Sequence, residues 1–182
     1  DLVFRFAKND GARALLAYEA QVLDVVGHHV RAPVPLIMHR TSNYMHYRFV
    51  PGTPLYRHLL LRANSQVQDR LAQDLATFLA ELHALPLSEI PAHPWPGAQL
   101  PANCTLLYKQ RLTALEKDIF PLLWADQKAW VYDLYAPIMD GRLDLDAFTP
   151  LLVHRDLASY HILYDAEGGR LTGVIDFGMA GA

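Results

Sequence analysis

Two short motifs in the C-terminal part of the chain carry acidic side chains at spacings that suit phosphoryl transfer. The first is His154-Arg155-Asp156, and the second is Asp176-Phe177-Gly178. Phosphoryl transfer needs a group that orients the attacking hydroxyl, acidic ligands that hold Mg²⁺ on the phosphates, and a cation near the phosphate charge. In the first motif, Asp156 is the candidate for the carboxylate that accepts the proton of the attacking hydroxyl.

Two further side chains are candidates for ligands of the metal ion. A metal-binding Asn is expected five positions after the catalytic carboxylate, and this chain has His161 there. Asp176 ends a short β-prone run, where its carboxylate would project into a cleft and bind the metal. An imidazole is a softer ligand than an amide oxygen, so His161 would shift the preference of the site toward Mn²⁺. The alternative is that His154, Asp156, His161 and Asp176 are ordinary polar loop residues that cap turns.

The N-terminal part offers a candidate ion pair for the phosphates. Glu19 lies on the apolar stripe of a helix predicted over residues 12–26, where a buried carboxylate is costly unless a cation pairs with it. Arg5 can be that cation, because strand alternation directs it away from the face of Phe4 and Phe6. A strand cation paired with a helix glutamate positions ATP phosphates in kinases. The alternative places Glu19 at the edge of the stripe, in solvent.

The rest of the sequence supplies the elements that would position these groups. Apolar periodicity, caps and turn residues predict each of them. The strands are expected over residues 2–6, 35–39 and 44–50, with further β-prone runs over 151–154, 162–164 and 171–175, the last two joined by a turn over 165–169. The helices are expected over residues 12–26, 67–85, 105–120 and 126–139, with Asp126 as the N-cap of the last, and residues 91–97 read as a proline-rich loop.

This order of elements predicts an α+β fold with two lobes. Residues 1–50 would form part of an N-terminal lobe that contains a small sheet and one helix and binds the nucleotide. Residues 51–182 would form a mainly helical C-terminal lobe that carries the catalytic loop and the metal site. The abrupt start on a strand and the end shortly after Asp176 suggest truncation at both ends.

Composition limits the classes of partner. The 182 residues are 52% hydrophobic and carry a formal charge of −3, so the chain should be globular and has no basic excess for binding nucleic acid. Its one cysteine, Cys104, allows no internal disulfide, which fits a reducing, cytoplasmic setting. No apolar run approaches the roughly 20 residues of a membrane span.

The motifs together resemble the aminoglycoside phosphotransferase and related antibiotic-kinase family, within the protein-kinase-like fold. The likeness is carried along nearly the whole chain by Val3-Phe4-Arg5-Phe6, Glu19, Tyr47-Arg48-Phe49-Val50-Pro51-Gly52, Leu82-His83, His154-Arg155-Asp156, His161-Ile162-Leu163 and Ile175-Asp176-Phe177-Gly178. The motifs at the C-terminal end are the most specific of these. His161 in place of the usual Asn is similar to the macrolide and 2″-aminoglycoside phosphotransferases.

This resemblance implies a role for each candidate residue. Asp156 would be the catalytic base, His161 and Asp176 would face Mg²⁺, and Arg5 with Glu19 would orient the phosphates of ATP or GTP. The backbone of the hinge between the lobes would meet the nucleobase, and its residues are Tyr47, Arg48, Phe49 and Val50.

Two features depart from the family pattern. Arg5 stands where a lysine is usual, so it offers a planar fork instead of a point charge. The glycine-containing loop that should cover the phosphates, and the helices expected after Asp176, lie outside the sequence. Activity of this segment by itself is therefore not expected.

The substrate is left open by the sequence. Acidic residues over 116–146 would suit a cationic aminoglycoside, and the aromatic residues Trp124, Trp130, Tyr132 and Tyr135 would suit a macrolide or a sugar. The principal hypothesis is phosphorylation of a hydroxyl of such an antibiotic. The alternatives are a metabolic kinase for a sugar, amino alcohol or homoserine, a metal-dependent hydrolase that uses His154, Asp156, His161 and Asp176 as ligands, and a pseudokinase that acts as a binding module.

Overall fold

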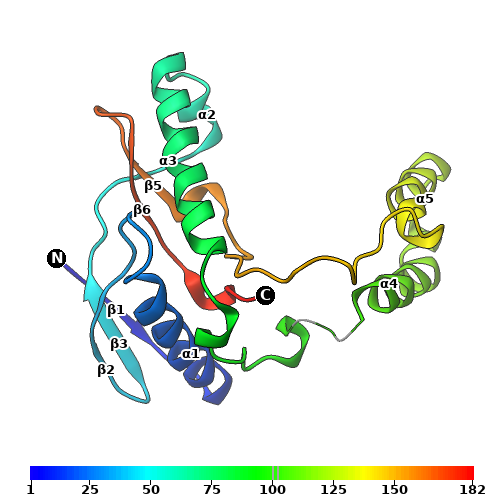
Figure 1. Ribbon diagram of the computed structural model, residues 1–182, viewed down its shortest axis with the longest axis horizontal. Coiled ribbons are helices and arrows are strands. Elements are labelled where there is room, and N and C mark those ends of the chain that lie inside the picture. Colours follow the sequence, from blue (N-terminus) through cyan, green and yellow to red (C-terminus); the bar gives the residue numbers. More distant parts are fainter. Residues whose placement is uncertain (100, 102) are drawn as a thin grey trace. The chain divides into compact units, whose positions relative to one another are not determined.

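The computed structural model describes residues 1–99, 101 and 103–182, and its strands and helices confirm the predicted α+β class (Figure 1). The strands are β1 (Leu2–Phe6), β2 (Ile37–Arg40), β3 (Tyr44–Arg48), β4 (Thr53–Pro54), β5 (Ile162–Asp165) and β6 (Arg170–Val174). The α-helices are α1 (Asp10–Val26), α2 (Arg57–Leu60), α3 (Ser65–His83), α4 (Cys104–Asp118) and α5 (Ala125–Met139). The chain forms two compact units, one of Asp1–Gln99 with Leu151–Ala182 and the other of Leu100–Pro150.

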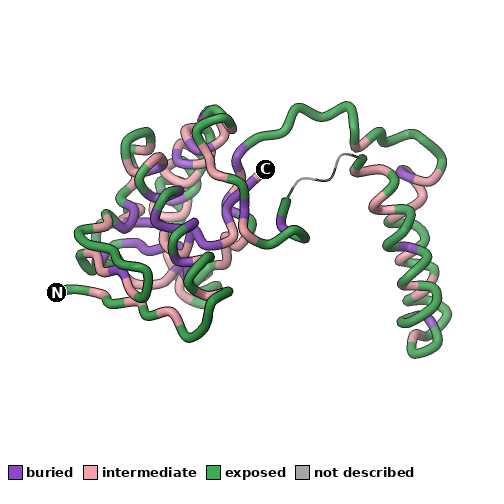
Figure 2. The backbone as a smooth tube through the Cα atoms, turned by 90° about the horizontal axis from the view of Figure 1, so that it is seen from below, coloured by how far each residue is buried: buried purple, intermediate pink, exposed green. Residues whose placement is uncertain are grey.

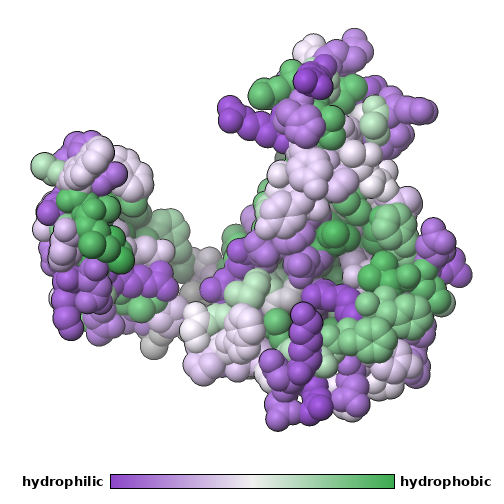
Figure 3. All heavy atoms as spheres, turned by 180° about the vertical axis from the view of Figure 1, so that it is seen from behind, coloured by the Kyte–Doolittle hydropathy of each residue, from purple (hydrophilic) through white to green (hydrophobic). Residues whose placement is uncertain are grey.

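The first sheet is antiparallel, with three strands in the order β1-β3-β2, and α1 packs against one of its faces. Strand alternation in β1 turns Arg5 toward the helix and turns Phe4 and Phe6 away from it, where 51% and 67% of their surfaces stay exposed. Figure 3 shows hydrophobic side chains gathered on the side of the molecule where this sheet lies. The phenylalanines of β1 therefore lie outside the core, and the arginine faces the interior.

Helix α1 begins at Asp10 because the side chain of Asn9 accepts a hydrogen bond from the backbone of Ala12 at 2.8 Å. An Asn at this position satisfies one of the free N–H groups of the first turn. The apolar stripe of the helix is buried as its periodicity predicted, and Glu19, with 1% of its surface exposed, is buried within it. The alternative of a solvated Glu19 is wrong.

The second sheet has the order β4-β5-β6, and α3 packs against β6. Its short edge strand β4 follows Gly52, whose φ of +147° favours glycine and whose Cβ position would lie 2.2 Å from the hydroxyl oxygen of Thr172. The chain therefore turns tightly over β6 at this glycine. Neither β4 nor α2 was predicted, because Pro51, Gly52 and Pro54 indicate only a turn.

The main hydrophobic core is built from three segments that lie far apart in the sequence. It contains Tyr18, Val22, Leu23 and Val26 from α1, Phe78 and Leu82 from α3, and Leu152, Val174 and Phe177 from the C-terminal part. The buried parts of these segments are drawn purple in Figure 2. Because the segment that ends in Phe177 is held in this core, the two motif regions have fixed places relative to α1.

The unit of residues 100–150 contains α4 and α5, which contact one another. The prediction that Asp126 caps α5 is wrong: Trp124 is the N-cap residue and Asp126 lies in the first turn. The side chain of Gln127 accepts a hydrogen bond from the backbone N–H of Trp124 at 3.0 Å. This is the bond that the third residue of a helix makes in a capping box, and it fixes the start of α5. None of the helices that the structure describes combines the length and the apolar character needed to cross a membrane.

Of the β-prone runs in the C-terminal part, 162–164 and 171–175 form the β5–β6 hairpin. The run 151–154 does not form a strand, and only Val153 pairs, in an isolated bridge with Gly181. This bridge connects the segment that precedes Asp156 with the segment that follows Asp176. The backbone hydrogen bonds that secure it run both ways, at 2.8 and 2.9 Å.

Candidate active site

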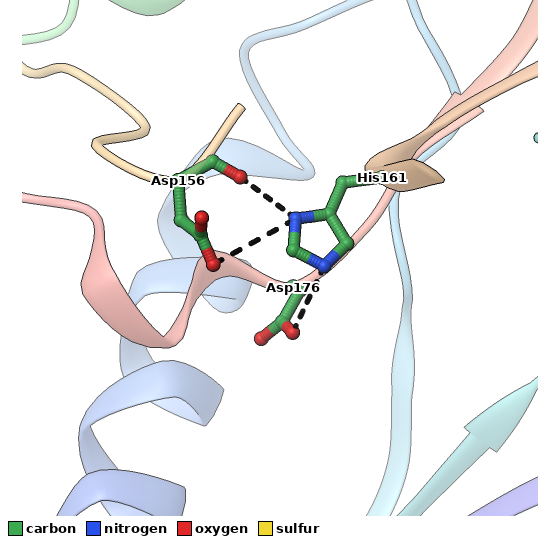
Figure 4. A group of neighbouring side chains, drawn as sticks. All are labelled: Asp156, His161 and Asp176. Atoms are coloured by element: carbon green, nitrogen blue, oxygen red, sulfur yellow. Dashed lines mark hydrogen bonds and ion pairs between the residues drawn. The ribbon is translucent and has the colours of Figure 1, made fainter. Parts of the chain in front are cut away.

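Three of the predicted site residues meet at one point of the first compact unit. Asp156, His161 and Asp176 each offer a ligand atom, and these atoms lie within 4.8 Å of one another (Figure 4). They come from the loop after Val153, from the 3₁₀ turn Ser159–His161 that leads into β5, and from the end of the segment after β6. The β5–β6 hairpin thus carries two of the three groups to the loop that holds the third.

The hydrogen bonds of His161 determine which ring nitrogen carries its proton. Nδ1 lies 2.7 Å from the carbonyl oxygen of Asp156, and since a carbonyl only accepts, Nδ1 must donate. In the neutral ring Nε2 then has a lone pair, and it faces Oδ2 of Asp176 at 3.3 Å. A lone pair facing a carboxylate oxygen at this distance suits a shared cation, so the three donors fit a divalent metal ion.

His154 is not available as a metal ligand, because both of its ring nitrogens have backbone partners. Nε2 donates to the carbonyl oxygen of Ile175 at 3.0 Å, and Nδ1 accepts from the backbone N–H of Asp156 at 3.4 Å. The ring also lies 4.6 Å from that of Phe177, centroid to centroid. Burial lowers the pKa of His154, which favours this neutral form. His154 therefore links the backbones next to the two aspartates, and the four-ligand arrangement is not formed.

Two residues of the motifs have backbone conformations that are uncommon for any residue but glycine. Asp176 has a φ of 67° and Arg155 a φ of 63°, in the left-handed region that costs on the order of 1 kcal/mol. Asp176 is itself a candidate metal ligand, and Arg155 directly precedes the candidate base Asp156. The guanidinium of Arg155 donates to the carbonyl oxygen of Ala98, so among the described residues it binds backbone and forms no ion pair.

Arg5 and Glu19 form the ion pair that strand and helix periodicity suggested. The other terminal nitrogen of Arg5 lies 3.7 Å from Oδ1 of Asp176, so one guanidinium faces both carboxylates. Burial raises the pKa of Glu19, and the charge of Arg5 opposes that shift. Burial disfavours the charge on Arg5, yet Glu19 and Asp176 outweigh it and leave the pKa of Arg5 raised. The guanidinium of Arg5 therefore lies between the buried carboxylate of Glu19 and the candidate metal ligand Asp176.

The four predicted hinge residues lie at the end of β3 and just beyond it. Tyr47 faces α1 from the position opposite Val3, and burial raises its pKa. Arg48 is exposed, and so is Phe49, whose backbone N–H donates to the carbonyl oxygen of Asp1 at 3.1 Å. Val50 is buried against Gly173, where a Cβ would approach to 2.3 Å. The structure does not bring these four into the group of Asp156, His161 and Asp176, and their contact with a nucleobase stays a prediction.

Two buried polar side chains beside the site were not recognised in the sequence. Tyr18 donates its hydroxyl hydrogen to the carbonyl oxygen of Ala180, and His93 lies 3.1 Å from the carbonyl oxygen of Gly178. His93 lies in the proline-rich segment 91–97, for which the sequence predicts only a loop. A histidine among prolines has no periodicity to indicate that it is buried, so no sequence signal could have found it.

Comparisons of the sequence and of the fold relate this chain to known proteins. The family model described as the phosphotransferase enzyme family matches residues 1–182. The structure titled as the GDP and kanamycin complex of APH(2″)-IIia is similar over all of this chain and 62% of its own, with 28% identity and a TM-score of 0.81. The GDP complex of wild-type aminoglycoside 2′-phosphotransferase-IIIa is similar over all of this chain and 61% of its own, with 28% identity and a TM-score of 0.78.

A third similar structure is the apoenzyme of macrolide 2′-phosphotransferase MphH from Brachybacterium faecium, with 22% identity and a TM-score of 0.70 over all of this chain and 59% of that one. At this identity it supports the fold alone. The chain thus spans about three fifths of the length of the solved structures that it matches. With a family model matched from its first residue to its last, the chain belongs to the phosphotransferase enzyme family.

Proposed function

We propose that this chain contains the catalytic loop and metal site of a kinase that transfers a phosphoryl group from ATP or GTP to a hydroxyl of a small molecule, an aminoglycoside or macrolide antibiotic. The observation that carries the proposal is the meeting of Asp156, His161 and Asp176, with Nε2 of His161 facing Asp176 at 3.3 Å. Family membership supplies the reaction class. The proposal extends to the whole protein, which acts in the cytoplasm, where nucleoside triphosphates are made.

Each residue has one task in the proposed reaction. Asp156 accepts the proton of the attacking hydroxyl, because its side chain is half-exposed at the edge of the group and a carboxylate is the usual acceptor in kinases. His161 and Asp176 hold Mg²⁺, which when bound neutralises charge on the transferred phosphate. Arg5 lies within reach of Asp176 and orients the phosphates, while Glu19 holds Arg5 in place.

The nucleotide and substrate classes rest on the similar structures. Among them are complexes with GDP and kanamycin, with ADP, and with ATP and streptomycin, and one complex with gentamicin. Cationic aminoglycosides would be attracted by carboxylates, and Asp118, Asp126 and Asp133 of α4 and α5 are exposed. Four further acidic residues of this unit already have protein donors: Glu116, Asp140, Asp144 and Asp146.

A substrate panel with radiolabelled ATP and GTP tests the proposal on the full-length protein. Transfer of label to an aminoglycoside or a macrolide, lost in Asp156→Asn, is the expected result. Transfer only to a sugar, an amino alcohol or homoserine would make the protein a metabolic kinase and would overturn the antibiotic substrate. Nucleotide binding without transfer to any acceptor, unchanged by Asp156→Asn, would indicate a binding module.

The hydrolase alternative requires His154 to be a metal ligand. Four protein ligands around an activated water would require a lone pair from that ring, and both its nitrogens are engaged by backbone groups. The arrangement therefore favours a metal that is recruited together with nucleotide phosphates. Equilibrium dialysis with Mn²⁺, with and without ADP or GDP, separates the two, because a hydrolase site would bind the ion tightly without nucleotide.

A further inference from the structure

The segment that follows Asp176 is held by side chains from two distant parts of the chain. The hydroxyl of Tyr18 on α1 donates to the carbonyl oxygen of Ala180. Nε2 of His93 lies 3.1 Å from the carbonyl oxygen of Gly178. Both side chains are almost fully buried, with 3% of Tyr18 and 4% of His93 exposed. Water therefore cannot replace either donor, and loss of one would leave a buried carbonyl without its partner.

The hydrogen bonds of His93 assign its proton without ambiguity. Nδ1 accepts from the backbone N–H of Trp95 at 3.1 Å, so in the neutral ring the proton is on Nε2, which donates to Gly178. The ring of His93 also meets that of Tyr18 edge to face, with centroids 4.5 Å apart. The carbonyl oxygen of His93 accepts from the side chain of Gln99 at 3.0 Å. Residues 93–99 thus present a fixed donor to the segment.

A third contact holds the same segment further along the chain. Gly181 pairs with Val153, and their backbone hydrogen bonds run both ways at 2.8 and 2.9 Å. The segment is then held at three points, at the carbonyls of Gly178 and Ala180 and at the backbone of Gly181. Since Asp176 itself has a strained backbone with a φ of 67°, the direction of its carboxylate depends on these neighbours. A strained backbone conformation persists only where contacts with the surrounding structure hold it in place.

We propose that Tyr18 and His93 are positioning residues, which set the affinity of the Asp156–His161–Asp176 group for a divalent cation by fixing the backbone after Asp176. The inference rests on the proposed metal site and adds two residues that bind neither metal nor nucleotide. Outer partners of this kind orient the ligands of metal sites, and their loss typically weakens metal binding about 10- to 100-fold. Neither residue touches the reacting atoms, so neither is a catalytic residue.

The test is Mn²⁺ binding to the full-length protein, followed by electron paramagnetic resonance in the presence of ADP or GDP. Tyr18→Phe removes one hydroxyl and keeps the ring, and His93→Leu removes the donor to Gly178. Each should raise the dissociation constant for Mn²⁺ about 10-fold. His93→Gln should restore binding, because its amide nitrogen can donate from the position of Nε2. Wild-type affinity in both Tyr18→Phe and His93→Leu overturns the inference.

A matched control separates positioning from a general loss of stability. Tyr164 is the other buried tyrosine in the described residues, and its ring packs in a different cluster with Leu55 and Leu71. Tyr164→Phe should leave Mn²⁺ affinity unchanged, and thermal unfolding of each variant shows whether it is folded. If His93→Leu does not fold, Tyr18→Phe decides the question by itself. A Mn²⁺ affinity that falls equally in Tyr164→Phe contradicts a specific role.

Failure of the metal site itself would look different. Asp176→Asn removes a proposed ligand and should weaken Mn²⁺ binding in the same measurement. If the wild-type protein binds no Mn²⁺ with nucleotide, or if Asp176→Asn binds it as well as wild type does, the proposed function is wrong and the inference falls with it. If Asp176→Asn loses affinity while Tyr18→Phe and His93→Leu keep it, only the inference is wrong.

Discussion

Nε2 of His161 lies 3.3 Å from Oδ2 of Asp176, while the opposite nitrogen of the ring donates to the backbone of Asp156. Two acceptors face each other without a hydrogen between them when the ring is neutral. A cation would turn this contact from repulsive to attractive, and this supports the metal site that we propose. The backbone carbonyl of Asp156 thus sets the tautomer of a proposed metal ligand.

Replacement of His161 by Asn should change which metal ion the protein prefers. The wild-type imidazole favours Mn²⁺ relative to Mg²⁺, and an amide oxygen is a harder ligand that suits Mg²⁺. We therefore expect His161→Asn to lower the ratio of Mn²⁺ to Mg²⁺ affinity, measured by calorimetric titration with GDP present. His28→Asn, at an exposed histidine of the first unit, is the control and should leave the ratio unchanged. An unchanged ratio in His161→Asn would show that the ring is not a ligand.

Asp156→Asn should abolish most phosphoryl transfer and leave nucleotide binding intact. A positioned general base contributes about 10²- to 10⁴-fold to the rate, and an amide cannot accept the hydroxyl proton. The turnover number of the full-length protein should fall by about that factor, while the dissociation constant for ATP or GTP stays within about twofold. Asp165→Asn is the control, because Asp165 ends β5 and its side chain accepts from the backbone of Gly168. A loss of nucleotide affinity that matches the loss of rate would assign Asp156 to binding instead.

Removal of Arg5 should destabilise the fold through the carboxylate left behind. Glu19 is 1% exposed and Arg5 is its partner, and an uncompensated buried charge typically costs about 3–5 kcal/mol. Because Arg5 is partly exposed, we expect Arg5→Met to lower the free energy of unfolding by about 2 kcal/mol. The double variant Arg5→Met, Glu19→Leu should recover most of this in urea titrations. No recovery would mean that the loss comes from packing of the arginine stem.

The contact between Arg31 and Glu81 should make the free energy of unfolding depend on pH in the acidic range. The backbone and side chain of Arg31 both donate to this carboxylate of α3 and lower its pKa. A lowered pKa in the folded state means that the unfolded chain binds more protons, so the stabilisation is present at neutral pH. It is lost as the pH falls below about 4.3, the ordinary pKa of Glu.

Glu81→Gln provides the measurement of this contact. Its loss of unfolding free energy at pH 7 should be about 1 kcal/mol or less, because the pair lies at the surface. The difference between wild type and Glu81→Gln should shrink as the pH falls from about 5 toward 3. A difference that is constant over that range would mean that ionisation of Glu81 contributes nothing to stability.

Periodicity and motif spacing predicted the elements that hold the site. The helix that carries Glu19, the strand that carries Arg5 and the hairpin between His161 and Asp176 were all predicted, since each has an apolar pattern or a turn signal of its own. The boundaries moved where a side chain decided them. Asn9 starts α1 earlier, and Trp124 replaces Asp126 as the cap of α5.

Three features of the site have no signal in the sequence. The short strand β4 depends on pairing with β5, and a two-residue edge strand has too little pattern to be recognised. The engagement of both nitrogens of His154 depends on the backbones of Asp156 and Ile175. The donors Tyr18 and His93 act on carbonyls far away in sequence. Such contacts depend on where distant segments meet, which local propensity does not encode.

The sequence by itself indicated the kind of chemistry that we propose, because Asp156, His161 and Asp176 have spacings that suit phosphoryl transfer to a hydroxyl. It also determined that Glu19 needed a cation, since a carboxylate on an apolar stripe must be compensated. Only the tertiary structure decided how these groups relate: the proton of His161 is assigned by a carbonyl, and the backbone after Asp176 is held by Tyr18 and His93. The physical reason is that hydrogen-bond direction depends on three-dimensional position, whereas residue type depends on sequence alone.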